Sequence, residues 1–236
     1  GSEMCIRDSL DVDGTGIDYE AKLPASAAKA VDQARANGHK VYICTGCSKA
    51  EILQRNLCDL DGMIGGNGAY VEDNGHVVMH QGLSKEDVKN IVDWCNERHI
   101  GFYLEANSGM YCNDYMLEQG PETMVKYAKG KGASLENAKS SAQHFIDGFI
   151  HLQEDELYRD DVNKISFILR TYQDHLDSKV DFPHLVANTW GGKGEVALFG
   201  DLGPTGITKR HAIEVLLDYL HAVSYTHLTL PTILLV

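Results

Sequence analysis

The chain has 236 residues, of which 43% are hydrophobic and 23% are charged, and these proportions are typical of a folded globular protein rather than a disordered one. Acidic residues outnumber basic residues by 34 to 21, and the resulting net charge of -13 argues against DNA or RNA as a partner. A small phosphorylated metabolite is still compatible with this charge, because a small anion responds to the local field of its pocket.

No apolar run approaches the roughly 20 residues that a membrane-spanning helix needs. The opening ten residues, GSEMCIRDSL, lack the apolar centre of a secretory signal. We therefore expect a cytoplasmic protein without a membrane partner, whose six scattered cysteines are reduced. Nothing in the sequence indicates an oligomeric state.

The two ends of the chain differ in character from the rest. Residues 1–9 and 223–236 resemble translated sequencing-adapter sequence, and Pro231 interrupts a β-rich run near the end. We expect both segments to be non-native and to take no part in function.

Strands and helices alternate in the first third of the chain. Pro24 suits an early helical position and Gly38 suits a helix end, while Ser48 is a good N-cap. This order indicates a parallel sheet with crossover helices. The expected elements are a strand ending at 10–13, a turn at 14–16, a helix over 24–37, a strand over 40–44, a helix over 48–57 and a strand over 62–64.

The middle of the chain changes to an α+β pattern, and an amphipathic helix over 208–220 follows it. Asn107-Ser108-Gly109 and Gly191-Gly192 each suit the turn of a hairpin. The expected elements are a helix over 84–98 capped by Ser84, a hairpin of 101–105 with 110–113, helices over 122–129 and 135–144, a strand over 164–170 and a hairpin of 185–190 with 195–199.

Two carboxylates, Asp11 and Asp13, stand one residue apart where the first strand ends. Ligands bind beyond the carboxyl ends of parallel strands, and like charges this close repel unless a cation neutralises them. Mg2+ suits the pair because it is often held by one or two carboxylates plus substrate phosphate. The first carboxylate can then attack phosphorus, and the second can transfer protons.

Two other readings of this acidic pair stand beside the magnesium hypothesis. One is a solvated acidic turn. The other is a calcium loop, but such a loop needs Glu at its twelfth position, and counting from Asp11 that position holds Lys22. Calcium is therefore disfavoured.

Three further segments could meet at the same edge of the sheet. Thr45-Gly46 follows a strand and precedes a helix, where backbone N–H groups bind phosphate. Asn67-Gly68 follows the third strand, and Lys209 begins the last helix, where its charge would stabilise a phosphoryl group. Each also has a plain structural explanation, as a helix cap, a turn residue or a solvated side chain.

In this order the segments resemble the motifs of the haloacid dehalogenase-type (HAD) phosphohydrolases, in the Cof-type branch with a type IIB cap. Residues 11–15, DVDGT, are similar to the first motif, and residues 44–46, CTG, to the second. Residues 67–69, NGA, match a motif after the third strand, and residues 207–209, ITK, resemble the third motif. The resemblance covers most of residues 10–222.

The resemblance implies an α/β fold, with a Rossmann-like parallel sheet core and an inserted α+β cap domain. The core would comprise residues 10–81 and 203–222, and the cap residues 82–202. It also implies a Mg2+-dependent phosphatase that hydrolyses small phosphorylated metabolites, such as sugar phosphates, through an aspartyl-phosphate intermediate.

The resemblance further assigns a role to each motif residue. Asp11 would be the nucleophile and a metal ligand, and Asp13 the general acid and base, with its backbone carbonyl on the metal. Thr45 and Lys209 would hold the phosphoryl group. The residues expected to contact substrate are Gly46, Asn67 and Gly68.

The chain departs from the family pattern at several positions. Gly16 replaces a bulky apolar residue, and Cys47 stands where the second motif usually has Arg. The fourth motif, GDxxND, should follow the Lys209 helix, but the chain ends before it. Gly200-Asp201 mimics its start yet precedes Lys209, so we expect a cap or hinge turn there. A catalytically impaired fragment of such an enzyme is therefore an alternative.

A redox function is a weaker alternative. Cys44 and Cys47 form a CxxC motif between a strand and a helix, where thioredoxin-like proteins carry theirs, and a helix start lowers the pKa of a thiol. This reading leaves the DVDGT segment unexplained.

Overall fold

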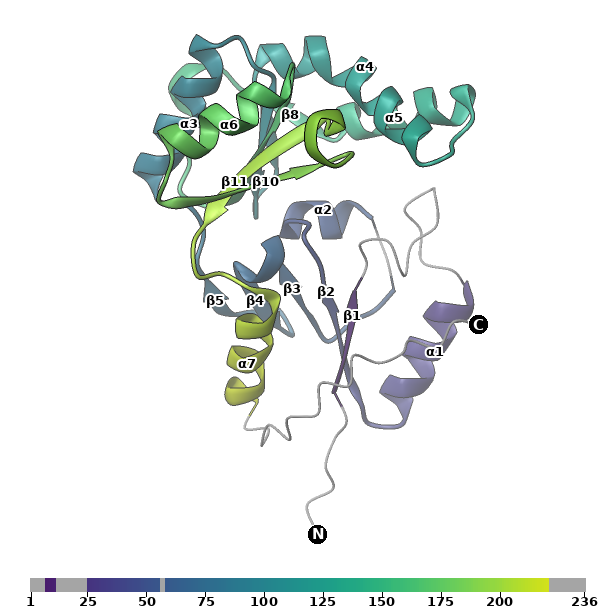
Figure 1. Ribbon diagram of the computed structural model, residues 1–236. Helices are drawn as coiled ribbons and strands as arrows, with labels where there is room; N and C mark the ends of the chain where they lie inside the picture. Colours follow the sequence, from purple (N-terminus) through teal and green to yellow (C-terminus); the bar gives the residue numbers. More distant parts are fainter. Residues whose placement is uncertain (1–6, 12–24, 56–57, 221–236) are drawn as a thin grey trace.

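The computed structural model describes residues 7–11, 25–55 and 58–220, which form two α/β layers, one above the other (Figure 1). The lower layer is a five-stranded sheet in the order β1-β2-β3-β4-β5, and the upper layer is a six-stranded sheet. The mixed α/β class predicted from the sequence is therefore confirmed. No helix among these residues is both long and apolar enough to cross a bilayer.

The lower sheet begins with the predicted parallel strands. Asp11 is in register with Cys44, and Cys44 with Ile64, so the three strands end at the same edge. Crossover helices connect them, as the alternating pattern requires. The strands are β1 (Arg7–Asp11), β2 (Lys40–Cys44) and β3 (Gly62–Gly65), and the helices between them are α1 (Ala25–Ala36) and α2 (Lys49–Gln54).

An antiparallel hairpin that the sequence analysis missed completes this sheet. It consists of β4 (Tyr70–Asp73) and β5 (His76–His80), which turn through Asn74-Gly75. Both turn residues have positive φ, 47° and 80°, which suits the Asn-Gly hairpin turns that match strand twist. The Asn-Gly pair between two β-rich runs was the available signal.

Helices α2 and α7 (Lys209–Tyr219) cover the lower sheet. Ser48 caps α2 in a capping box with Glu51, as its position predicted, although α2 ends earlier than expected. Ile52 of α2 packs with Ile43 and Met63, whereas Ala212 and Leu216 of α7 pack with the side chains of alternate strand positions, Tyr42, Cys44, Ile64 and Val71. The two helices therefore cover opposite faces.

The upper sheet has the order β10-β11-β9-β6-β7-β8, and all its pairs are antiparallel except β7 with β8. Its helices are α3 (Lys85–Glu97), α4 (Asp114–Gly130), α5 (Leu135–Asp147) and α6 (Tyr172–Asp181). Its strands are β6 (Phe102–Ala106), β7 (Met110–Cys112), β8 (Phe149–His151), β9 (Val162–Ile168), β10 (Leu185–Trp190) and β11 (Phe199–Pro204).

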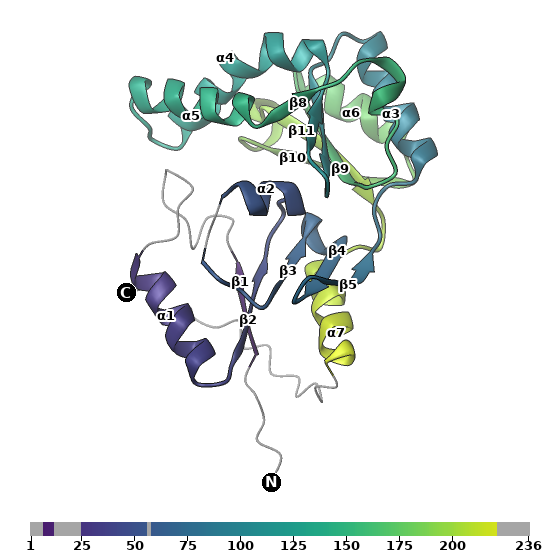
Figure 2. The ribbon, with the colours of Figure 1, turned by 180° about the vertical axis from the view of Figure 1, so that it is seen from behind.

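The two faces of the upper sheet bury different clusters. One face packs against α3 and the end of α6, with Leu104, Ile165 and Leu202 at its centre. The other face carries Tyr103, Ile168 and Phe199, which pack against α4 and α5. Helix α2 lies between the two sheets (Figure 2).

The second predicted hairpin was assigned to the wrong segment. Strand β10 pairs with β11, not with 195–199, and Gly194–Val196 form a short 3-10 turn. Gly200-Asp201 therefore lie in a strand between β10 and β9 and not in a turn. A Cβ on Gly200 would lie 2.5 Å from the Phe167 ring. Packing therefore requires glycine at this position, although glycine weakens a strand. The predicted boundary at 202–203 falls inside this strand.

Four other elements differ from expectation. Helix α4 begins at Asp114 rather than at 122 and continues through Pro121, because its Gly120 packs against Ile146 of α5 and this tertiary contact outweighs the local break. Strand β9 begins at Val162, two residues earlier than predicted. Strand β8 and helix α6 were not predicted at all.

Candidate active site

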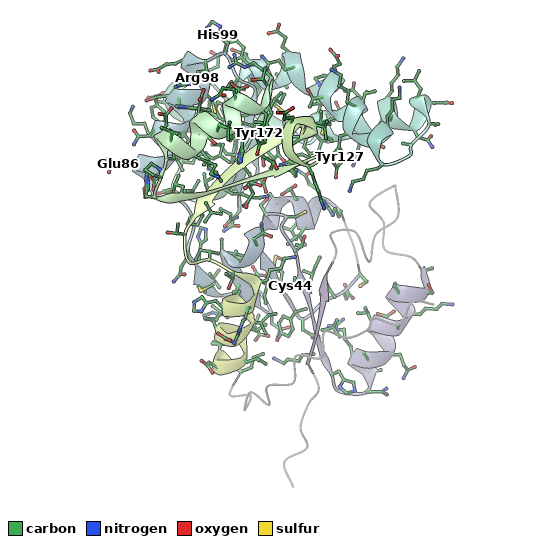
Figure 3. All side chains as sticks on the ribbon, viewed as in Figure 1. Cys44, Glu86, Arg98, His99, Tyr127 and Tyr172 are labelled. Carbon is green, nitrogen blue, oxygen red and sulfur yellow. The ribbon has the colours of Figure 1, made fainter. Side chains whose placement is uncertain are left out.

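The candidate motif segments leave the lower sheet at one edge. Asp11 is the last residue of β1 and lies beside Cys44 at the end of β2, while Gly65 ends β3. Figure 3 shows Cys44 in the lower layer, beneath the upper-layer segments that carry Arg98, His99 and Tyr172. Of Asp11 the structure describes the backbone alone, and Asp13 lies outside the described residues.

The loop after β2 is tied to the loop after β3. Thr45 is fully buried, and its backbone N–H donates to the Ile64 carbonyl oxygen at 2.9 Å. Its Oγ1 accepts from the Cys47 N–H at 3.2 Å. The Asn67 N–H donates to the Thr45 carbonyl oxygen at 3.1 Å. Thr45, which directly follows β2, is therefore held by β3 and by the loop after β3, and the half-buried Gly46 follows it.

The loop after β3 in turn contacts the start of α7. Asn67 is exposed and has a left-handed φ of 57°. Gly68, with φ 105°, lies very close to α7. A Cβ on it would be 2.4 Å from the Thr208 carbonyl oxygen and 3.0 Å from the backbone nitrogen of Lys209. Thr208 caps α7 by accepting from the His211 N–H at 3.1 Å. Lys209 begins this helix, half-buried.

The structure thus brings together four of the segments singled out from the sequence, those containing Asp11, Thr45, Asn67-Gly68 and Lys209. It does not describe the Asp13 segment. Among the residues that are described, no group of three or more His, Cys, Asp or Glu side chains could hold a metal ion. The magnesium ligands Asp11 and Asp13 therefore stay a prediction.

A pocket between the two layers was not foreseen from the sequence. Three of its lining residues come from the lower layer or from the turn before α7, and the others come from β9, β10 and β11 of the upper sheet. The lining residues are Gly66, Asn67, Ile207, Asn163, Lys164, Val186, Asn188, Asp201, Gly203 and Pro204. No local pattern marks these positions, because they meet only through strand pairing in the upper sheet.

The upper wall of this pocket carries the charged side chains of Lys164 and Asp201, and Lys164 also contacts the buried Glu105. Glu105 is only 2% exposed, lies 3.3 Å from the Lys164 ammonium and accepts from Ser166 Oγ at 2.7 Å. Burial raises the pKa of Glu105 to about 8. Burial acts to lower the pKa of Lys164, but the carboxylates of Glu105 and Asp201 overcome this and raise it. Both groups therefore favour their protonated forms.

The geometry gives no support to a redox pair at Cys44 and Cys47. Both thiols are buried. Cys44 packs with Ile64 and Ala212 on the α7 face of the sheet, whereas Cys47 packs with the α2 cluster on the opposite face. A thioredoxin-like mechanism needs neighbouring and partly accessible sulfur atoms.

Comparison with known proteins identifies relatives across almost the whole chain. The family described as haloacid dehalogenase-like hydrolase matches residues 9–225. The 5-amino-6-(5-phospho-D-ribitylamino)uracil phosphatase of Bacillus subtilis is 30% identical over 115 residues, which are 48% of this chain and 37% of that protein. The chain therefore matches little more than a third of the length of this curated relative.

Solved structures share the fold at low sequence identity. A haloacid dehalogenase-like hydrolase from B. subtilis has a TM-score of 0.75 at 18% identity, and the match covers 92% of this chain and 79% of that one. A HAD subclass IIB sugar phosphatase has a TM-score of 0.64 at 20% identity, covering 92% of this chain and 76% of that one. These matches agree with a Rossmann-like core carrying a cap domain.

Proposed function

Because the chain belongs to the family of haloacid dehalogenase-like hydrolases, we propose that it is a Mg2+-dependent phosphatase of small phosphorylated metabolites. The observation that carries this proposal is the meeting of motif segments from distant parts of the chain. Asp11, Thr45, Asn67-Gly68 and Lys209 come from four different elements and share one edge of the lower sheet. Such an edge is where parallel α/β sheets bind their ligands.

In the proposed reaction Asp11 attacks the phosphorus atom of the substrate, and the bond from phosphorus to the leaving oxygen breaks. Asp13 protonates that oxygen and later removes a proton from the water that hydrolyses the aspartyl-phosphate. The carboxylate of Asp11 and the backbone carbonyl of Asp13 are hard oxygen donors that fit Mg2+. When bound, the cation would neutralise charge on the phosphoryl oxygens.

The other motif residues would hold the phosphoryl group. Thr45 is buried in a loop that is hydrogen-bonded to β3 and to the loop after β3, and its hydroxyl accepts from the Cys47 N–H, so the hydroxyl has little freedom to move. Lys209 supplies a positive charge from the start of α7, where the contact with Gly68 fixes the helix. Gly46, Asn67 and Gly68 complete the binding loops. A fixed array of donors stabilises transition-state charge better than a mobile one.

The relatives and the pocket support a proposal for the substrate class. One solved relative is named as a sugar phosphatase, and the curated relative as a phosphatase of a ribitylamino-uracil phosphate. The lining of the pocket above Asn67 includes polar side chains of the cap, among them Lys164, Asn188 and Asp201. We therefore propose sugar phosphates or related metabolites as substrates, with the upper layer as the selecting cap.

Hydrolysis of an aryl phosphate with and without Mg2+, in the native protein and in Asp11→Asn, tests the proposal. Asp32→Asn, on the exposed surface of α1, is the matched control. We expect activity that requires Mg2+, survives in Asp32→Asn and falls by a factor of about a thousand or more in Asp11→Asn. Activity that persists in Asp11→Asn, or a folded protein that hydrolyses no phosphate ester, would refute the proposal.

A further inference from the structure

A β-bulge in the upper sheet alters the direction of one pocket residue. Glu105 of β6 is in register with Lys164 of β9, but the next residue, Ala106, is in register with Val162. Asn163 therefore has no partner on β6, and the alternation of side chains is broken at this point. As a result Asn163 and Lys164, although consecutive, both line the pocket between the two layers.

The amide nitrogen of Asn163 is already committed. Asn163 Nδ2 donates to Asn107 Oδ1 at 2.8 Å, and Asn107 Nδ2 lies 3.2 Å from His80 Nε2. With Nε2 of His80 as the acceptor, the two amides have one consistent orientation. The chain of hydrogen bonds runs from the end of β5 to the pocket and presents the Oδ1 atom of Asn163 as its last acceptor.

That acceptor is buried and unsatisfied among the described residues. Asn163 is 1% exposed, and its Oδ1 has no hydrogen-bond partner there. Leaving a buried acceptor unpaired destabilises the folded state, so such a group calls for an explanation, and a bound ligand supplies one. Asn163 thus combines three features. A β-bulge sets its direction, a chain of hydrogen bonds fixes its amide, and its Oδ1 has no partner among the described residues.

Asn163 also touches the loop that carries a candidate motif. A Cβ on Gly66 would lie 2.8 Å from Asn163 Cβ and 3.0 Å from its Cγ, so the cap side chain rests directly on the residue before Asn67. The position is therefore next to the proposed phosphoryl site but on the cap side. A phosphate ester bound there would extend its leaving group toward Asn163.

We propose that Asn163 is a specificity-determining residue, whose Oδ1 accepts a hydrogen bond from a hydroxyl group on the leaving group of the substrate. This inference rests on the proposed phosphatase function and deepens it. Its neighbours suit the same ligand, because the carboxylate of Asp201 offsets the charge of Lys164, and Asn188 donates to Asp201 at 3.2 Å. Recognition in this pocket thus depends on hydrogen bonds rather than on a net charge.

A matched pair of substrates isolates the hydroxyl interaction. A pentitol phosphate and pentyl phosphate have the same chain length and phosphate group, but only the first carries hydroxyl groups. We expect the native protein to prefer the pentitol ester in kcat/KM. Asn163→Leu should lower kcat/KM for the pentitol ester about tenfold or more and leave pentyl phosphate unaffected, because a site built to pair a hydroxyl loses only that discrimination.

Two further variants separate recognition from folding. Asn137→Leu makes the same change on the exposed surface of α5 and should leave kcat/KM unchanged for both esters. Asn163→Ala replaces Asn163→Leu if leucine prevents folding. Equal losses for both esters in the Asn163 variants would give Asn163 a structural role only and overturn the proposal. So would the absence of a pentitol preference in the native protein.

Calorimetry with the two corresponding phosphonates distinguishes this inference from the proposed function. If no ester is hydrolysed, the phosphatase proposal fails, yet binding still tests Asn163. Tighter binding of the pentitol phosphonate that disappears in Asn163→Leu would support the acceptor role. Equal binding of the two phosphonates by the native protein, or no binding of either, would overturn it.

Discussion

Gly68 and Thr208 lie in contact although 140 residues separate them in the chain, and a Cβ on Gly68 would be only 2.4 Å from the Thr208 carbonyl oxygen. Through this contact the loop after β3 meets Thr208, the N-cap residue of α7, and Lys209 begins the helix. The atoms that face Gly68 belong to the backbone of Thr208 rather than to a flexible side chain, so they cannot easily move away from an added Cβ. The contact therefore sets the distance between two candidate motifs.

Gly68→Ala should destabilise the protein by about 2 kcal/mol or more, since it combines overpacking with a left-handed φ. Urea unfolding measures this. Gly75→Ala is the matched control, because Gly75 has φ 80° but open space around it, and should cost only about 1–2 kcal/mol. Equal losses in the two variants would show that the contact with Thr208 is unimportant.

Thr45→Val should lower stability by about 1–3 kcal/mol, because the buried Cys47 N–H loses its acceptor, Thr45 Oγ1. Thr45→Ser keeps the hydroxyl and should stay within about 1 kcal/mol of the native protein. If Thr45 also binds phosphate, KM for an aryl phosphate rises in the valine variant alone. A valine variant as stable as the serine variant would contradict the hydrogen bond.

Glu105→Gln should change how stability depends on pH. The folded pKa of Glu105, about 8, lies above its ordinary value of 4.5, so the folded state binds the extra proton. The contribution of Glu105 is therefore complete below pH 4.5 and is lost as pH rises through the folded pKa. Between these values the native protein should lose up to about 1.4 kcal/mol per pH unit relative to Glu105→Gln.

Urea unfolding at a series of pH values measures this difference. Glu136→Gln, on the exposed surface of α5, controls for the same change of side chain. Parallel stability curves for the native protein and Glu105→Gln would mean that Glu105 does not hold a proton in the folded state.

The ion pair of Lys49 and Glu72 should show a coupling energy of about 1–2 kcal/mol in a double-mutant cycle with Lys49→Met and Glu72→Gln. Lys49 Nζ lies 2.5 Å from Glu72 Oε2, and Glu72 is 9% exposed and also accepts from the Tyr70 hydroxyl at 2.5 Å. The exposed pair of Glu122 and Lys126, four residues apart in α4, should give a much smaller coupling energy, because solvent screens it. Equal couplings for the two pairs would contradict the role of burial.

The sequence by itself determined the features that depend on neighbouring residues. Ser48 and Ser84 cap α2 and α3 as predicted, because each needs only a backbone N–H three residues ahead. The strand at 40–44 was predicted with its observed bounds, since a short β-rich run before a helix cap is a local signal. The alternation of strands and helices also predicted that the motif segments would end at one edge.

Only the tertiary structure decided the features that depend on distant partners. FGDLGP becomes strand β11 because β10 and β9 satisfy its backbone on both sides, although its glycines have low strand propensity. Helix α4 continues through Pro121 because α5 packs against it. Asn163 faces the pocket because a bulge against β6 turns it. Its amide nitrogen donates to Asn107, and its Oδ1 has no hydrogen-bond partner in the described part of the chain. These outcomes arise from strand pairing and packing between segments far apart in the chain, and no local pattern records them.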